Sequence, residues 1–178
     1  MLDLTGLIWL LLVVFVLHDL EELIAVENWL VKNKGRVMQA APPRLRKMIG
    51  PSLAMSTAQF AVAVACMFAI LSSAVLLTVT TLEQRTFLPF FLVCLHVLFL
   101  HVFTHVGQSL ALRMYTPGVL TAVAVVLPYS LYTYFRLFAE GAVTWTLVIR
   151  TLPFVVLIVP ILLGAHRLGQ IVSKPAGR

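Results

Sequence analysis

The chain has 178 residues, of which 61% are hydrophobic and 11% are charged, and its mean hydropathy is +1.00. Seven acidic and thirteen basic residues are too few to cover the surface of a soluble domain of this length, so the composition excludes a soluble globular protein and predicts that lipid surrounds most of the chain. The net charge of +6 does not indicate nucleic acid as a partner, because most basic residues fall between apolar stretches.

Five apolar windows are long enough to cross a bilayer, which takes roughly 20 residues of helix. They cover residues 4–30, 53–79, 87–112, 119–138 and 143–163. We therefore expect residues 1–178 to form one all-α domain, an integral membrane protein built as a bundle of about five transmembrane helices. The first window lacks the basic start and the small-residue cleavage site of a signal peptide, so we expect it to stay in the mature protein.

The densest basic cluster lies between the first two windows, and Pro42 and Pro43 within it are expected to interrupt any helix. Its members are Lys32, Lys34, Arg36, Arg44, Arg46 and Lys47. Cytoplasmic loops carry an excess of Lys and Arg, so this loop is predicted to be cytoplasmic. Five crossings then place the N-terminus outside and the C-terminus in the cytoplasm, in a multi-pass protein of the plasma (bacterial inner) membrane.

The first window contains an acidic turn, His18-Asp19-Leu20-Glu21-Glu22, with no loop signal around it. One acidic residue at the centre of a membrane helix costs roughly 2.5–3.5 kcal/mol, so a partner, water or a metal must compensate for several of them. At 100° per residue, His18, Glu21 and Glu22 share a sector of about 100° and can all face the bundle interior. Asp19 lies just beyond that sector, and we expect it to support the site from its edge.

The third window carries a polar stripe, because His101, His105 and Gln108 follow i, i+4, i+7 spacing. The depth of each group follows from its distance along the helix to the nearest basic residues, at 1.5 Å per residue. On this count, the polar stripe and the acidic turn lie at the same depth, about 12–21 Å from their cytoplasmic basic residues. The two groups are therefore predicted to meet. Ser56 and Gln59 of the second window fall at a matching depth, and we expect them to complete a polar shell with Gln108.

Two histidines at i, i+4 with a carboxylate from another helix make a ligand set used by zinc and by non-haem iron. The sequence thus predicts one divalent metal ion. Its candidate ligands are His18, Glu21, Glu22, His101 and His105. One of the two glutamates is the expected ligand and the other the catalytic acid/base, without an assignment of which is which. Two metals are disfavoured, because di-iron bundles carry Glu-x-x-His on two helices.

The residues of the predicted site, together with nearby ones, resemble those of a known protein family. The His18-Asp-Leu-Glu21-Glu22 turn, Trp29, the run from His101 to Ser109 and the Tyr-Thr-Pro-Gly turn of residues 115–118 resemble the bacterial membrane-protein family named for its HXXEE motif. That family has no assigned reaction, so the resemblance implies the motif residues and not a substrate. A weaker similarity links the chain to intramembrane proteases of the CAAX-processing type. Here the histidine precedes the Glu-Glu pair and the third motif differs, so peptidase activity does not carry over.

The sequence favours a membrane-embedded metalloenzyme, either a zinc-type hydrolase or a non-haem iron oxidoreductase, acting on a hydrophobic or lipid-linked substrate in the cytoplasmic half of the bilayer. One alternative is a transporter or channel that uses the same residues as an ion or proton relay, for which a homodimer would supply further helices. Another is a structural membrane protein in which the polar cluster only joins helices. His96, on the far side of its helix from His101 and His105, is expected to be structural.

Overall fold

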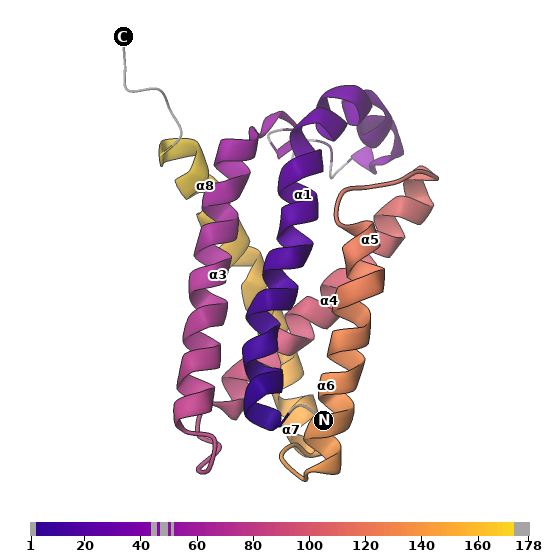
Figure 1. The fold of residues 1–178 in the computed structure, drawn as a ribbon. Coiled ribbons are helices and arrows are strands. Elements are labelled where there is room, and N and C mark those ends of the chain that lie inside the picture. Colours follow the sequence, from indigo (N-terminus) through magenta and orange to yellow (C-terminus); the bar gives the residue numbers. More distant parts are fainter. Residues whose placement is uncertain (1–2, 44–45, 47–49, 51, 173–178) are drawn as a thin grey trace.

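The computed structural model describes residues 3–43, 46, 50 and 52–172, and all regular secondary structure within them is helical (Figure 1). The 3-10 helices are η1 and η3, and η2 is a π-helical turn. In chain order the elements are α1 (Leu4–Ala40), η1 (Ser52–Ala54), α3 (Thr57–Thr80), α4 (Leu88–Leu112), α5 (Val119–Thr121), η2 (Ala122–Val126), α6 (Leu127–Ala139), α7 (Trp145–Thr151), η3 (Leu152–Leu157) and α8 (Ile158–Val172). Since α5–η2–α6 and α7–η3–α8 are each continuous, the described residues make five long helical segments, which confirms the all-α prediction.

Four of these segments are long and apolar enough to span a membrane: Thr57–Thr80, Leu88–Leu112, Val119–Ala139 and Trp145–Val172. The fifth, α1, packs against α3 on one side and against α4, η2 and α6 on the other (Figure 1). Large apolar side chains remain exposed on the outside of the bundle, among them Ile24 (78%), Leu110 (71%) and Val156 (70%). Such an apolar surface suits lipid and not water as the surrounding solvent.

The helix boundaries follow local sequence signals. Asp3 caps α1 by accepting a hydrogen bond from the backbone N–H of Gly6 at 2.7 Å, and α1 ends at Ala40, just before Pro42 and Pro43. α4 ends at Leu112, and Arg113 after it adopts a left-handed backbone conformation with φ of 50°. The prolines thus end the helix as the sequence predicts.

Two segments continue beyond their predicted ends. The predicted windows stop at residues 30 and 163, whereas α1 runs to Ala40 and α8 to Val172. Lys32, Lys34 and Arg36 therefore lie on a helix and not in a loop. Hydropathy marks where the apolar part of a helix stops, but Lys and Arg are good helix formers, so the helix itself continues into the polar layer.

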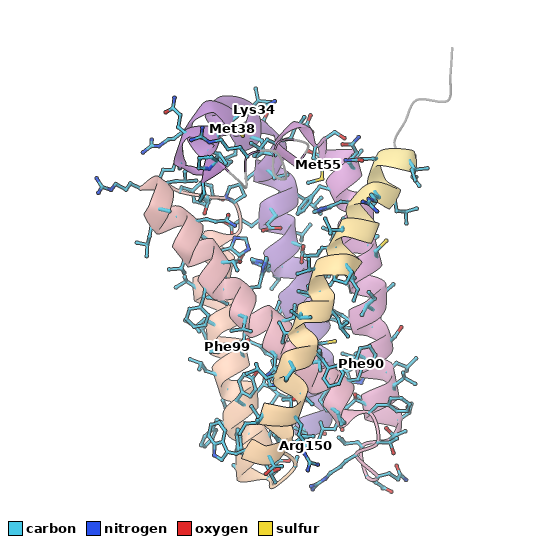
Figure 2. All side chains as sticks on the ribbon, turned by 180° about the vertical axis from the view of Figure 1, so that it is seen from behind. Lys34, Met38, Met55, Phe90, Phe99 and Arg150 are labelled. Atoms are coloured by element: carbon cyan, nitrogen blue, oxygen red, sulfur yellow. The ribbon has the colours of Figure 1, made fainter. Side chains whose placement is uncertain are left out.

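The two ends of the bundle differ in charge. At the end where α1, α4 and α8 finish, called the basic end below, lie Lys32, Lys34, Arg36, Arg46, Arg113 and Arg167. The described basic residues of the opposite end are Arg85, Arg136 and Arg150. Figure 2 shows Lys34 and Arg150 at these two ends. α1 begins at the opposite end and α8 finishes at the basic end (Figure 1).

The tightly packed apolar core lies toward the opposite end. Its fully buried side chains include Leu7, Ile8 and Leu11 of α1 and Phe91, Leu92 and Leu95 of α4. The acidic turn of α1 and the two histidines of the polar stripe on α4 come later along both rising helices, on the basic-end side of this core (Figure 1). The core thus holds α1 and α4 together just below the point where their polar residues meet.

Candidate metal centre

The acidic turn faces the interior of the bundle. His18 is 1% exposed and Asp19 8% exposed, and the Glu22 side chain is 14% exposed. His18 and Glu22 are four residues apart, so both side chains lie on the same face of α1. Leu20 and Ile24, between and beyond them, are exposed on the outer surface. The helical period of α1 therefore separates its ionisable residues from the surrounding lipid.

α4 brings two further imidazoles to the same point. His105 Nε2 lies 3.0 Å from Glu22 Oε1 and 2.8 Å from His101 Nε2, which confirms that the acidic turn and the polar stripe meet. The ring centroid of His18 lies 4.8 Å from that of His105 and 5.3 Å from that of His101. One ligand atom from each of the four side chains lies within 4.8 Å of all the others. His18, Glu22, His101 and His105 could therefore hold a metal ion.

Hydrogen bonds set the tautomer of His18. The hydroxyl of Thr121 donates its only proton to a hydrogen bond with Glu21 Oε2 at 2.6 Å, and Thr121 Oγ1 also lies 3.0 Å from His18 Nδ1. Because the Glu21 carboxylate has no proton to donate, Thr121 Oγ1 must accept a hydrogen bond from the Nδ1–H group of His18. This leaves a lone pair on His18 Nε2, an atom that is buried without a hydrogen-bond partner among the described residues. Metal-binding histidines are commonly oriented in this way through their second nitrogen.

His101 is oriented by a similar contact. The hydroxyl of Thr104 donates to the backbone carbonyl of His101 at 2.7 Å and lies 3.3 Å from His101 Nδ1. With its proton used, Thr104 Oγ1 accepts from Nδ1, and the lone pair of His101 is again on Nε2. Zn–N bonds of about 2.0–2.1 Å separate tetrahedral ligands by roughly 3.4 Å. The observed separations of 2.8 and 3.0 Å need only a small expansion, so the residues present fit a metal ion.

Glu21 has a different role from Glu22. Its carboxylate accepts hydrogen bonds from Tyr115 Oη at 2.7 Å and from the backbone N–H of Thr121 at 2.8 Å and of Leu120 at 3.4 Å. Glu21 thus binds the free N–H groups at the start of α5, where a negative charge is favourable. Burial, with the Glu21 hydrogen bond and charge adding to it, raises the pKa of Tyr115 to about 12, so the phenol remains a donor. The sequence left the roles of the two glutamates open, and the geometry separates them.

The turn of residues 115–118 closes the site at the basic end. Trp29 Nε1 donates to the carbonyl of Tyr115 at 2.8 Å, and Gly118 has φ of +87°. A Cβ at Gly118 would lie 2.5 Å from His105 Cε1 and 2.8 Å from Glu22 Oε1. Only glycine combines this backbone conformation with so close an approach. The sequence does not assign Gly118 or Thr121 to the site, because the roles of both residues depend on how the turn folds.

A cavity of about 330 Å³ opens beside the four candidate ligands. Asp19 and Gln108 line it, in keeping with their predicted place around the site, and so does Thr116 of the closing turn. Asp19 Oδ2 and Thr116 Oγ1 are both buried without a hydrogen-bond partner in the described part of the chain. Buried polar atoms are normally satisfied, so these two oxygens mark places where a bound molecule can interact.

Ser56 and Gln59 have a local role instead of the predicted place in the polar shell. The Ser56 side chain accepts from the backbone N–H of Gln59 at 3.3 Å, and the Gln59 side chain accepts from the backbone N–H of Ser56 at 3.2 Å. This reciprocal pair is a capping box, and it starts α3 at Thr57. The prediction placed both residues inside a helix beginning near residue 53, whereas they stabilise the first turn of a later one.

The fold and the site together define a helical protein with membrane-spanning segments and an internal cluster of histidines and a glutamate. The family model described as "Protein of unknown function with HXXEE motif" matches residues 9–133, a range that includes all four clustered side chains. The chain belongs to this HXXEE family. No curated protein and no solved structure matches it.

Proposed function

We propose that the protein is a membrane-embedded, metal-dependent enzyme that acts on a hydrophobic or lipid-linked substrate. One observation carries this proposal: three imidazoles and a carboxylate converge within 4.8 Å inside an apolar bundle, with His18 Nε2 left buried and unpartnered. Ionisable residues at this depth are costly, and a divalent cation compensates for the carboxylates while using the imidazole lone pairs.

A purely structural network explains the site less well. Polar residues that join helices are stable when every buried donor and acceptor is paired. Here His18 Nε2, His105 Nδ1 and Asp19 Oδ2 are buried without partners among the described residues. These atoms would each destabilise a network that had no further ligand. A bound ion supplies the missing partner of His18 Nε2, and a bound substrate supplies that of Asp19 Oδ2.

Zinc and iron both suit the donor set, with different consequences. A catalytic zinc uses three protein ligands and one open position. Zinc chemistry therefore uses three of the four side chains as ligands and leaves the fourth beside the open position. Iron accepts six ligands and keeps open positions even when all four side chains bind it. When bound, zinc would supply Lewis-acid chemistry and iron would supply redox chemistry beside the cavity.

The other residues of the site position its ligands. Glu21 and Thr121 orient His18 through consecutive hydrogen bonds of 2.6 and 3.0 Å, while Gly118 allows the closing turn to approach His105. Asp19 faces the cavity with a free carboxylate oxygen, which makes it, and not Glu21, the carboxylate placed to contact substrate. Glu21 is already bound to the start of α5.

The orientation of the bundle belongs to the same proposal. Most described basic residues lie at the basic end, and cytoplasmic ends carry such an excess. We infer that this end faces the cytoplasm of a bacterial cell, that the N-terminus lies outside, and that the site opens in the cytoplasmic half of the inner membrane. Surface labelling of a cysteine introduced at Lys34 tests this orientation. Labelling from the periplasmic side would contradict it.

Elemental analysis of the purified protein, prepared without chelators, tests the metal proposal. We expect about one equivalent of zinc or iron in the wild type, and loss of that metal in a His101→Ala/His105→Ala variant. His96→Leu is the matched control, because it removes a histidine of the same helix that lies outside the cluster. A folded wild-type protein without metal, even after incubation with each ion, would refute the proposal.

A further inference from the structure

A second cavity, also about 330 Å³, continues the first one toward the opposite end of the bundle. Its lining is almost wholly apolar, with Thr151 as the one hydroxyl. The wall is formed by α3, α4, η3 and α8, and Phe90 of α4, labelled in Figure 2, belongs to it. No ionisable side chain that is charged near neutral pH lines this cavity.

The two cavities share part of their walls. The common residues are Met67, Leu71, Cys94, Val97 and Ile158. Along α4, the lining residues run from His105 and His101, through Val97 and Cys94, to Pro89. Pro89 lies twelve positions before His101, which corresponds to about 18 Å along the helix. This length matches an extended chain of about 14 carbons, given C–C bonds of about 1.5 Å in a zigzag.

The packing of the helices explains why this space exists. α8 packs along α3, whereas α4 packs against α7 and η3 at the opposite end. Gly169 permits the close approach of α8 to α3, because a Cβ there would lie 2.4 Å from the backbone oxygen of Gln59. α8 is thus drawn toward α3 and leaves an apolar space between itself and α4. The space leads from the metal centre into the apolar half of the bundle.

The polar end of the space has a defined chemistry. Two largely buried acidic side chains, Glu22 and Asp19, line this end of the space, and no Lys or Arg among the described residues lines either cavity. An anionic head group would therefore meet acidic side chains without a lysine or arginine to pair with. The unpartnered Asp19 Oδ2 accepts a hydrogen bond, and Thr116 Oγ1 both donates and accepts. A hydroxyl satisfies these atoms and offers oxygen to a metal.

We propose that the two cavities form one binding site for a single-chain amphiphile, a long-chain or isoprenoid alcohol, with its hydroxyl head at the metal centre and its chain along α4. This inference rests on the proposed metal-dependent function, for which it names the substrate class. Each buried methylene contributes about 0.8 kcal/mol, equivalent to roughly fourfold in affinity, so the apolar cavity supplies most of the binding.

Photolabelling of the full-length protein in phospholipid nanodiscs tests this site. The probe is hexadecanol with a diazirine near the chain end and an alkyne tag, and unlabelled hexadecanol is the competitor. Val97→Trp fills the wall that both cavities share, and Leu100→Trp is its matched control, since Leu100 lies on the same helix, is 39% exposed and lines neither cavity. Metal content is measured on every variant.

We expect competitor-sensitive labelling of the peptides that contain residues 89–97 and 154–161, reduced roughly tenfold or more by Val97→Trp and unchanged by Leu100→Trp, with metal retained in both. The matching hexadecanoic acid probe should label roughly tenfold less. Metal-loaded protein without competitor-sensitive labelling, or equal labelling of the two tryptophan variants, would refute the binding site and leave the metal proposal intact. Equal labelling by the acid would refute the neutral head group. A protein without metal would refute the proposed function itself.

Discussion

Two buried histidine sites on α4 differ in how completely their hydrogen bonds are satisfied. His96, toward the opposite end, has both ring nitrogens paired: Nδ1 with Tyr134 Oη, and Nε2 with Thr151 Oγ1 at 3.0 Å. His105, nine residues later, keeps Nδ1 buried without a partner in the described residues, as His18 keeps Nε2. Both sites lie inside the same apolar bundle. The first site thus joins helices with its hydrogen bonds complete, whereas the second leaves ring nitrogens unpaired, as the proposed metal site requires.

The largest expected effect comes from closing the space beside the second site. Gly118→Ala forces a Cβ to within 2.5 Å of His105 and 2.8 Å of Glu22, at φ of +87°. The left-handed conformation alone costs roughly 1–2 kcal/mol for a non-glycine residue, and the displaced ligands add to it. We expect loss of metal together with a lower thermal unfolding temperature. Gly107→Ala on α4 has open space around the new methyl group and should change neither, so parallel behaviour of the two variants would contradict this role of Gly118.

The second largest expected effect is a difference in metal affinity between variants of the two adjacent glutamates. Glu22→Gln removes the carboxylate that lies 3.0 Å from His105 Nε2, so metal affinity should fall by roughly 100-fold or more, beyond the 10- to 100-fold typical of residues that only orient a ligand. Glu21→Gln keeps an oxygen near Thr121 and should lower affinity by about tenfold or less. Titration of the apoprotein with zinc or iron measures both. Equal losses would show that the geometric separation of the pair has no chemical consequence.

Much of this arrangement follows from the sequence. Helices of this kind are predictable because apolar length is a direct requirement of the bilayer, and four of the five described helical segments meet that requirement. The meeting of the acidic turn with His101 and His105 follows from their matched depth. Ser56 and Gln59 have the spacing of a capping box as well as that of a polar stripe. Their depth in the membrane favoured the polar stripe, whereas the structure shows the capping box. Gly118 and Thr121 were not predictable, since their contacts depend on how a four-residue turn folds back over the site.

A smaller effect is expected from the residue that orients His18. Thr121→Val removes the hydroxyl between Glu21 Oε2 and His18 Nδ1 while keeping the shape of the side chain. Metal affinity should fall by roughly 10- to 100-fold, the usual result of losing an orienting hydrogen bond. In a His18→Ala background the same substitution should have no further effect, because the residue it orients is gone. Additive losses in this double-mutant cycle would assign Thr121 a role independent of His18.

The smallest effect on metal binding belongs to the satisfied histidine. His96→Leu leaves the hydroxyl groups of Tyr134 and Thr151 without their imidazole partner in a buried region, so the free energy of unfolding should fall by about 1–3 kcal/mol. Thr151 retains its bonds to the carbonyls of Leu147 at 2.8 Å and Val148 at 3.1 Å, which favours the lower part of that range. Metal content should stay at the wild-type level, because no contact joins His96 to the four clustered side chains in the described structure. Thermal unfolding in detergent and elemental analysis of the same preparation give both values. Loss of metal from a folded His96→Leu protein would show that the two histidine sites are coupled through α4, and that complete hydrogen bonding does not distinguish a structural histidine from a functional one in this bundle.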